Sequence, residues 1–272
     1  MPDRRIHRGP HPADGKLFAP SMVENLRAAL EDYSLLLTKG YGEKSSLKLV
    51  GDRFSLIERQ RLAVMRGTCS DQQLASRGQR RVEIDALKGQ ALAIDGYNVL
   101  ITIEAAMSGG VIFKGRDGCY RDLASIHGTY RKVTETIPAV QLIGDFLREV
   151  GVANALWLLD SPVSNSGRLK TLIRELAEKN GWDGFDSSRR RLPRHGGTCR
   201  NPAEPEQDKL TAGWEIRLSI SPDAELTRTD LIVASSDSVV LDGCTRWVNL
   251  ATEIITQELP SATVLDLAPD AI

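Results

Sequence analysis

The sequence predicts an α/β domain with a mostly parallel central sheet, preceded by a small all-helical domain. Residues 91–272 alternate short apolar runs with amphipathic runs, which is typical of parallel strands connected by helices. Residues 21–75 show apolar side chains at helical spacing only, so a separate helical unit is expected there. A third observation locates a site, because three apolar runs are closed by the aspartates Asp95, Asp160 and Asp237.

The helical domain is expected to contain three short helices, over residues 22–37, 45–50 and 55–66. Ser21 and Ser55 are the expected N-caps, because a glutamate follows each of them three residues later and completes a capping box. Gly40 and Gly51 follow the first two helical runs and are expected to end them.

Three segments are expected to be irregular. Residues 1–20 carry arginines and prolines without an apolar core, which predicts a disordered tail. Residues 76–90 are rich in Arg, Gly and Gln and are expected to be a linker. Residues 183–213 have no periodicity and little to bury, which predicts a disordered insertion. His195 and Cys199 lie in this insertion but lack the second ligand pair of a zinc site.

In the α/β domain, strands are expected over residues 91–95, 155–159, 214–220, 231–234 and 246–249. Helices are expected over residues 133–150, 166–180 and 250–258, with a short one beginning at Val239. The Gly-rich passage 108–118 predicts a hairpin or a loop.

The composition is that of an ordinary globular protein. The chain has 272 residues, of which 41% are hydrophobic and 26% charged, and its net charge is −1. No apolar run approaches the length of a membrane span, so no membrane partner is expected. The four cysteines form no CxxC pair, which argues against disulfides and structural zinc and favours a cytoplasmic location. Residues 1–90 are mildly basic, which would suit a polyanion-binding module.

The aspartates that close the apolar runs indicate a metal site. In an open α/β sheet, ligands bind at the carboxyl ends of the strands, where these side chains would meet. Carboxylates gathered at one edge repel one another unless protons or a cation neutralise them. Oxygen ligands suit hard divalent cations, so the expected cofactor is Mg²⁺ or Mn²⁺.

Four motifs carry a resemblance to a known family. They are the DGYN motif at residues 95–98, the run DSPVSNSGR at 160–168, the run ASSDS at 234–238 and the run SLKLVGDR at 46–53. The first three resemble a PIN-like domain. More closely, the chain looks like the DUF434/DUF5616 proteins, in which a short helical DUF434 region precedes a PIN-like domain.

The resemblance implies a three-layer α/β/α sandwich and metal-dependent RNA cleavage. PIN-domain nucleases gather three or four acids around the metal, and by motif position Asp95, Asp160 and Asp237 match three of them. Asp122 and Asp242 are the two candidates for a fourth ligand. The long Gly-rich second segment departs from ordinary PIN domains, so the identity of the fourth acid stays open.

Other polar residues are candidates for supporting roles. The expected ligand-orienting or phosphate-binding residues are Asn98, Ser161, Ser164, Asn165, Ser235 and Ser236. The expected RNA-binding residues are Arg121, Arg131, Arg168, Lys48, Arg53 and Arg59. His127 is a candidate proton carrier or a structural histidine.

The leading hypothesis is a metal-dependent ribonuclease of the PIN-like class that acts on RNA phosphodiesters. Two alternatives stay open: a catalytically inactive RNA-binding or scaffold protein, and a metal-dependent phosphoryl hydrolase on small substrates. An open basic groove beside the acids would favour the two RNA hypotheses, whereas a deep narrow pocket would favour a small substrate. The sequence does not decide between a monomer and a homo-oligomer.

Overall fold

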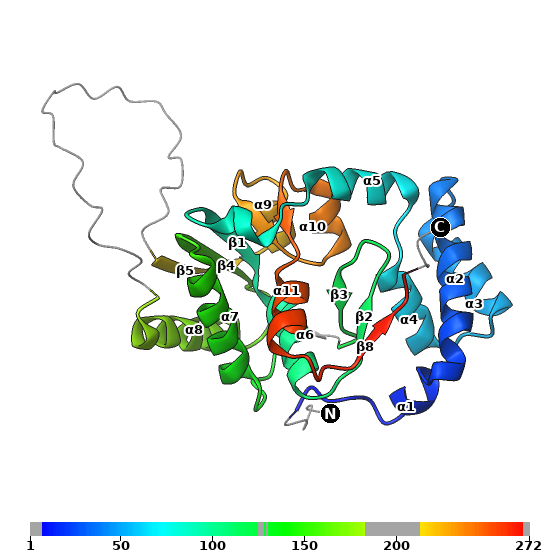
Figure 1. Cartoon of the computed structure of the whole chain (residues 1–272), viewed down its shortest axis with the longest axis horizontal. Helices are drawn as coiled ribbons and strands as arrows, with labels where there is room; N and C mark the ends of the chain where they lie inside the picture. The colour runs from blue at the N-terminus through cyan, green and yellow to red at the C-terminus, as the bar shows by residue number, and fades with distance from the viewer. Residues whose placement is uncertain (1–6, 125–127, 129, 183–212, 269–272) are drawn as a thin grey trace, which may run out of the picture.

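Five parallel strands form the central sheet of the protein, which Figure 1 shows as a computed structural model. They are β1 (Ala91–Asp95), β4 (Asn154–Asp160), β5 (Gly213–Ser219), β6 (Ile232–Ala234) and β7 (Trp247–Val248), in the order β5-β4-β1-β6-β7. The structure describes residues 7–124, 128, 130–182 and 213–268. The predicted α/β class with a mostly parallel sheet is confirmed, and all five predicted strands are present.

Helices cover both faces of this sheet. On one face, Leu92, Ile94 and Trp157 pack against helices α6 (Gly96–Met107), α7 (Thr136–Val150), α8 (Ser166–Asn180) and α11 (Leu250–Glu258). On the other face, Ala93 and Leu158 pack against the shorter helices α9 (Pro222–Leu226) and α10 (Ser238–Gly243). Successive strand residues therefore point to opposite layers, as the pleat of a buried strand requires.

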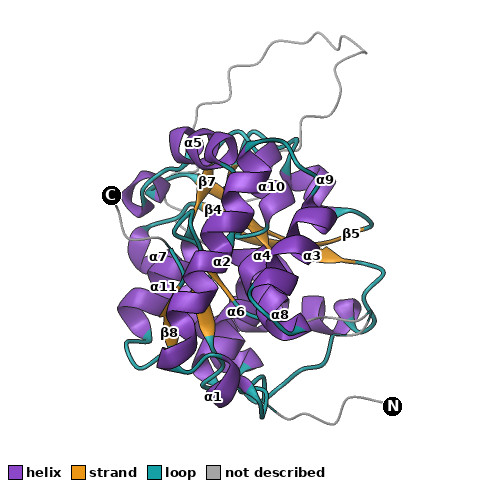
Figure 2. Cartoon of the chain, turned by 90° about the vertical axis from the view of Figure 1, so that its right-hand side faces the viewer, coloured by secondary structure: helices purple, strands orange, loops and turns teal. Residues whose placement is uncertain are grey.

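The N-terminal region is helical, as the sequence predicts. Its helices are α1 (Asp14–Leu17), α2 (Pro20–Thr38), α3 (Glu43–Arg53), α4 (Glu58–Gly67) and α5 (Asp71–Arg80), and Figure 2 shows α2, α3 and α4 side by side on one face of the molecule. The predicted caps differ. Helix α2 begins at Pro20 after Ala19, and helix α4 begins after Ile57, whose N–H donates to the Gln60 side chain (3.2 Å).

A second, small sheet lies between the helical region and the central sheet (Figure 1). It contains β2 (Ile112–Lys114), β3 (Tyr120–Arg121) and β8 (Val264–Asp266), in the order β3-β2-β8. Strands β2 and β3 form an antiparallel hairpin, so the Gly-rich passage is a hairpin. Phe113 and Leu267 belong to the same hydrophobic core as Leu26, Leu30 and Val64 of the helical region. The helical region therefore completes its core with side chains from the α/β part.

Two segments that the sequence predicts to be irregular are ordered. Within the predicted tail, the described residues 7–20 pack onto the protein: Asp14 is 2% exposed and Phe18 is 7% exposed. Within the predicted linker 76–90, α5 continues to Arg80 and a 3-10 turn, η1, covers Ile84–Leu87. Both predictions missed partners that lie far away in the sequence. Residues 183–212 of the predicted insertion, with His195 and Cys199, and also His127 lie outside the described residues.

Two further expectations concern disulfide bonds and membrane spans. Cys69, Cys119 and Cys244 are buried free thiols. In the described ranges, none of the helices is both long and apolar enough to cross a bilayer.

Candidate active site

The carboxyl ends of three neighbouring strands meet at one edge of the central sheet. Strand β1 lies between β4 and β6 and is parallel to both. Asp95 is the last residue of β1, Asp160 is the last residue of β4, and Ser235-Ser236-Asp237 follows the last residue of β6. The sheet therefore brings the three predicted aspartates to the same edge. We call these three residues, together with Asp223 after β5, the acidic edge.

Asp95 is the most deeply buried member of the acidic edge. Its side chain accepts a hydrogen bond from the Ser235 hydroxyl (2.7 Å), and the residue is only 7% exposed. Burial raises the pKa of Asp95 to about 7, against the lowering effect of the Ser235 hydrogen bond, and the charges of Asp237 and Asp223 add to the rise. A carboxyl group that titrates near neutral pH beside other carboxylates is typical of a functional site.

The loop after β6 is fixed by polar contacts to helix α6. Asn98 accepts hydrogen bonds through Oδ1 from the Ser236 N–H (2.8 Å) and the Ser236 hydroxyl (3.0 Å). Ser235 Oγ also accepts from the N–H of Asp237 (3.0 Å). Ser235 thus joins Asp95 to Asp237. These contacts give the predicted supporting residues Asn98, Ser235 and Ser236 a clear positioning role.

Asp237 has a structural role in addition to its place in the acidic edge. Its Oδ1 accepts from the N–H groups of Val239 (2.8 Å) and Val240 (3.3 Å), so it is the N-cap of α10. Capping occupies one carboxylate oxygen and fixes the direction of the side chain. Asp237 also lines a cleft, described below, so its position is compatible with both capping and binding.

Asp160 and Asp223 complete the acidic edge. Asp160 is partly buried, and burial raises its pKa. Burial also raises the pKa of Asp223, and the charges of Asp237 and Asp160 contribute to that rise. Asp223 is not among the residues predicted from the sequence. The signal was present, because β5 ends at Ser219 and Asp223 follows it, which is the pattern that identified the other three acids.

A cleft of about 240 Å³ opens beside Asp237, between helix α6 and the loop after β6. Asn98, Asp122 and Arg66 also line it. Asp122 accepts from the Thr102 hydroxyl (2.8 Å) and from the N–H of Ala124 (2.6 Å), and Arg66 lies 3.8 Å from its carboxylate. Of the two candidates for a fourth ligand, Asp122 is therefore the one that lies in the cleft.

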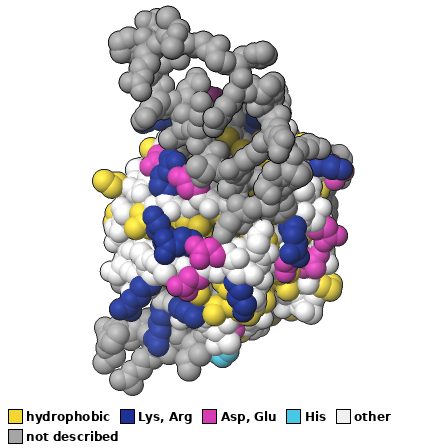
Figure 3. Space-filling model, turned by 90° about the vertical axis from the view of Figure 1, so that its left-hand side faces the viewer, with side chains coloured by type: hydrophobic (Ala, Val, Ile, Leu, Met, Phe, Trp, Pro, Cys, Tyr) yellow, Lys and Arg dark blue, Asp and Glu magenta, His cyan; other side chains and the backbone are white. Residues whose placement is uncertain are grey.

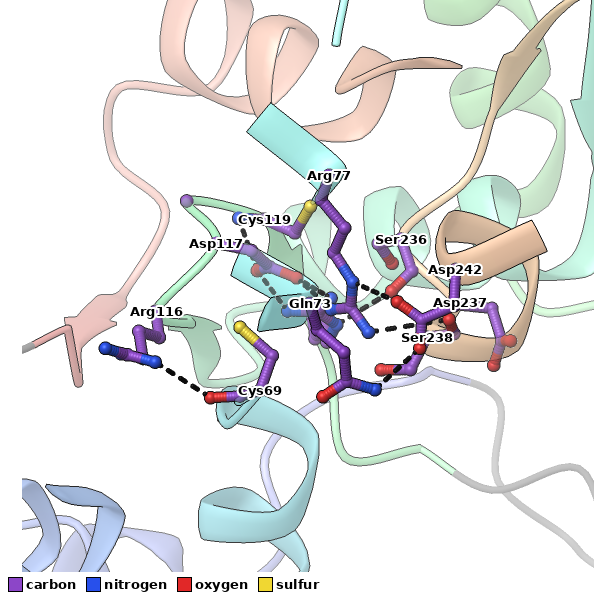
Figure 4. A network of polar contacts seen from close by, with 12 residues as sticks. Cys69, Gln73, Arg77, Arg116, Asp117, Cys119, Ser236, Asp237, Ser238 and Asp242 are labelled. Carbon is purple, nitrogen blue, oxygen red and sulfur yellow. Dashed lines mark hydrogen bonds and ion pairs between the residues drawn. The ribbon is translucent and has the colours of Figure 1, made fainter. Parts of the chain in front are cut away.

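Asp242, the other candidate for a fourth ligand, is exposed and pairs instead with the buried Arg77 at the margin of an ionic network (Figure 4). It accepts from Arg77 Nε (2.7 Å) and from Gln73 Nε2 (2.7 Å), both on α5. Arg77 is 1% exposed and also donates to Asp117 (2.6 Å), in the turn between β2 and β3. The sequence suggested neither of these partners, because residues from three distant segments form the network.

Arg121, which the sequence predicts to contact RNA, is also part of this network. It is 6% exposed, and its two terminal nitrogens donate to Asp117 (2.8 and 2.6 Å). Its Nε donates to the carbonyl of Ser236 (2.8 Å). Burial favours a higher pKa for Asp117, but Arg121 and Arg77 hold that pKa well below the usual value. Arg121 therefore supports the loop that carries Asp237 and is not available to a phosphate.

The predicted basic residues of the helical region are also engaged. Lys48 pairs with Asp52 (2.7 Å) and Arg53 with Asp32 (3.3 Å), at the surface. Arg59 holds the buried Asp14 with two hydrogen bonds (2.5 and 2.9 Å). At these three positions the helical region does not present unpaired cations.

The remaining predicted residues lie in and around the loop from β4 to α8. The Ser161 N–H donates to the carbonyl of Ser219 (2.7 Å), and Ser164 and Asn165 bind the backbone of residues 128 and 130. Asn165 precedes α8 but makes no side-chain cap bond. Arg168 on α8 is exposed, as is Arg131 opposite it, and both line a second cleft.

The donor set of the acidic edge fits a hard cation in its chemistry, since it consists of oxygen atoms whose charges repel. In the part of the chain that the structure describes, no three His, Cys, Asp or Glu side chains lie close enough to hold a metal ion directly. Mg²⁺ commonly binds through one or two carboxylates and keeps its other sites for water and substrate phosphates. Asp95 and Asp237 are the residues that would hold it in this way.

Asp95→Asn is expected to stabilise the protein at alkaline pH. The folded-state pKa of Asp95 lies above its unfolded value of about 3.9, so folding favours the protonated form, and the free energy of unfolding falls as pH rises from about 4 to about 7. An asparagine at this position does not ionise, so the free energy of unfolding of the variant should not fall in this way. Urea denaturation with chelator should show a gain of roughly 2–4 kcal/mol at pH 8 and little change at pH 4. An unchanged or lower stability at pH 8 would contradict the burial argument.

The fold and the site define an α/β protein with an acidic edge at the carboxyl ends of its strands. A family model described as a protein of unknown function (DUF434) matches residues 25–80. A second, described as a domain of unknown function (DUF5616), matches residues 84–190 and 197–253. The second match covers more than half of the chain, so the protein belongs to the DUF5616 family, with a DUF434 region before it.

A curated relative is similar to this chain. It is the uncharacterized protein MJ0935 of Methanocaldococcus jannaschii, which is 31% identical over 151 residues, or 56% of this chain and 72% of the relative. No solved structure matches the chain significantly. The family and its order of regions are those that the sequence motifs imply, while the PIN-like assignment stays a prediction.

Proposed function

We propose that the protein is a metal-dependent ribonuclease of the PIN-like class that acts in the cytoplasm. The observation that carries this proposal is the acidic edge, where Asp95 and Asp160 end two neighbouring parallel strands and Asp237 and Asp223 follow the strands on either side of them. Burial raises the pKa of Asp95 to about 7, and the negative charges of Asp237 and Asp223 add to that rise. A divalent cation relieves such repulsion and is the usual partner of carboxylates in phosphodiester hydrolysis.

The residues fall into two groups: those that would hold the metal, and those that would position the metal-holding side chains. A bound Mg²⁺ or Mn²⁺ would supply an activated water and would stabilise charge on the phosphate. Asp95 and Asp237 would hold it, and Asp160 and Asp223 would orient its waters. Ser235 donates to the Asp95 carboxylate and accepts from the backbone N–H of Asp237, and Asn98 holds Ser236, so the two residues would position the metal-holding side chains through the loop after β6. Arg66 lines the cleft beside Asp237, but its Nη1 already donates to the carbonyls of Asp122 (2.5 Å) and Ala124 (3.2 Å), so we do not count it among the phosphate-binding groups.

The arrangement of the clefts favours RNA over a small substrate. The cleft beside Asp237 is small, at about 240 Å³, and a larger one of about 610 Å³ with exposed basic residues adjoins the loop that follows Asp160. Several separated phosphate contacts suit a polymer better than a single small phosphate ester. We therefore favour a ribonuclease over a phosphoryl hydrolase.

The test is cleavage of single-stranded RNA by the purified full-length chain. The protein should cut RNA with Mn²⁺ or Mg²⁺ and stop when chelator is added. Hydrolysis of a small phosphate ester under the same conditions without RNA cleavage would favour the phosphoryl hydrolase. Tight RNA binding without cleavage over many substrates would favour the inactive RNA-binding protein.

Mn²⁺ or Mg²⁺ is expected to raise the melting temperature, because a ligand bound only by the folded state stabilises it. When the free metal concentration is 100 times the dissociation constant, the free energy of unfolding rises by about 2.7 kcal/mol. Differential scanning fluorimetry at pH 8, where Asp95 is charged, measures the shift. Asp95→Asn should remove most of it, since the variant lacks a charged ligand, whereas an equal shift in the variant would place the ion elsewhere.

A further inference from the structure

A cleft of about 610 Å³ lies between helix α8 and residues 130–132, which precede α7. Arg168, Thr171, Leu172 and Glu175 line one wall, at the spacing of a single helix face. The floor is apolar, because Leu169 is buried and Leu172 is half-buried. A volume of this size and an apolar floor with a few polar groups are typical of small-ligand sites.

Three basic side chains, Arg131, Lys132 and Arg168, and one acidic side chain, Glu175, line this cleft, so its net charge is positive. Arg131 and Lys132 are exposed on one side and Arg168 on the other. No described acidic side chain forms an ion pair with any of the three, whereas Arg174 on the same helix lies 3.8 Å from Glu178. Figure 3 shows Lys and Arg side chains gathered on the lower part of the face that carries β5, α7 and α8. Cations that converge without a protein partner favour an anionic ligand.

The walls of the cleft are held in place before any ligand arrives. The carbonyl of Tyr130 accepts from Asn165 Nδ2 (2.9 Å), and the Tyr130 N–H donates to the carbonyl of Ser164 (3.1 Å). The Tyr130 hydroxyl donates to the buried Glu104 (2.6 Å), and its ring lies 5.2 Å from that of Tyr97. A preformed site loses less entropy on binding, so these contacts favour affinity.

The position of the cleft connects it with the acidic edge. Strand β4 ends at Asp160, and the loop 161–165 leads from there directly to α8. Tyr97, which follows Asp95 in the chain, hydrogen-bonds to Ser166 at the start of α8 (2.7 Å). A ligand in the cleft would therefore lie beside the proposed reaction site.

We propose that this cleft, the nucleotide cleft, binds one nucleotide of a single-stranded RNA substrate. The base would lie against Leu169 and Leu172, and the phosphates would contact Arg131, Lys132 and Arg168. Single-strand recognition combines basic groups that track the backbone with side chains, usually aromatic, against which the bases pack, and in this cleft leucines would take the place of the aromatic rings. This inference rests on the proposed function for its substrate and deepens it by naming where the strand is held.

Binding is tested in chelator, so that neither metal nor cleavage contributes. Fluorescence polarisation of a labelled oligouridylate should report binding to the full chain, with uridine 5′-monophosphate, ribose 5-phosphate and inorganic phosphate as competitors. The nucleotide should compete about tenfold better than ribose 5-phosphate, because base contacts add to the phosphate contacts. Equal competition by all three would reduce the cleft to an anion site and overturn the proposal.

Arg168→Ala and Arg174→Ala form a matched pair on the same helix. Arg168→Ala should weaken oligouridylate binding and reduce the slope of log affinity against log salt by about one, whereas Arg174→Ala should change neither. Thr171→Glu, which adds a negative charge at the wall, should weaken binding without altering the melting temperature. Equal losses in the two arginine variants would overturn the proposal. Because no arm depends on cleavage, failure of the nuclease proposal would leave these results interpretable.

Discussion

Asp95→Asn and Asp237→Asn are each expected to reduce metal-dependent RNA cleavage by more than about 100-fold, because loss of an outer partner of a metal ligand alone typically costs 10- to 100-fold. Both changes remove a charge that would hold the cation, while RNA binding in chelator should survive, since phosphate contacts come from basic groups. Ser235→Ala should show the smaller loss, because it removes only the hydroxyl that joins Asp95 to Asp237. Gel assays of RNA cleavage at several Mn²⁺ concentrations measure all three.

Asp230→Asn is the control for these variants. Asp230 is exposed and precedes β6, so it lies at the opposite end of the strand that leads to Asp237. The change removes the same charge away from the acidic edge, and cleavage should be unaffected. Undiminished activity in Asp95→Asn, with purity verified, would mean that the site lies elsewhere or that a contaminating nuclease is present.

Asp117→Ala is expected to destabilise the fold by about 3–5 kcal/mol, the usual loss when one member of a buried ion pair is removed. Asp117 is the shared partner of Arg77 and Arg121, so the change leaves the buried Arg121 without a carboxylate and the buried Arg77 with Asp242 alone. Urea denaturation with a two-state analysis measures the free energy of unfolding.

The comparison variant for Asp117→Ala is Asp145→Ala. Asp145 pairs with Arg148 on the exposed side of α7, and exposed pairs contribute no more than about 1 kcal/mol. Similar losses in both variants would mean that the buried network has no special weight. Asp117→Asn should lie between wild type and Asp117→Ala, because the amide oxygen can still accept a hydrogen bond although the charge is gone.

The fold was predictable wherever periodicity and end signals agree. Helix α8 begins and ends where Asn165 and Gly181 indicate, and β4 covers the apolar run before Asp160. Helix α6 was not predicted, because ten of its residues are buried and it therefore has no polar face to reveal its period. Helix α5 falls partly within the predicted linker, since its Arg and Gln residues have partners only in the folded chain.

The candidate site was likewise predictable in part: its residues at strand ends could be located, but their partners in the folded protein could not. The rule that polar residues at the carboxyl ends of parallel strands share one edge located Asp95, Asp160 and Asp237. The same rule applies to Asp223, which follows the end of β5. The rule could not separate a ligand from a member of an ion pair: Asp242 pairs with Arg77, which is 165 positions away and leaves no local pattern, and Arg121 pairs with Asp117 only four residues before it in the same hairpin. The second pairing has a local spacing, but its burial against the Ser236 carbonyl depends on tertiary structure.

The core shared between α2 and the small sheet has a consequence for synthesis of the protein. Arg27 Nε donates to the carbonyl of Asp266 (3.2 Å), across 239 positions of the chain, and Leu267 packs beside Leu26 and Leu30. A ribosome that adds 5–20 residues per second reaches this point on the order of ten seconds or more after it has made α2. During that delay the apolar face of α2 lacks its final cover, so the nascent N-terminal helices are candidates for chaperone binding, and they complete their core only when the last strand arrives.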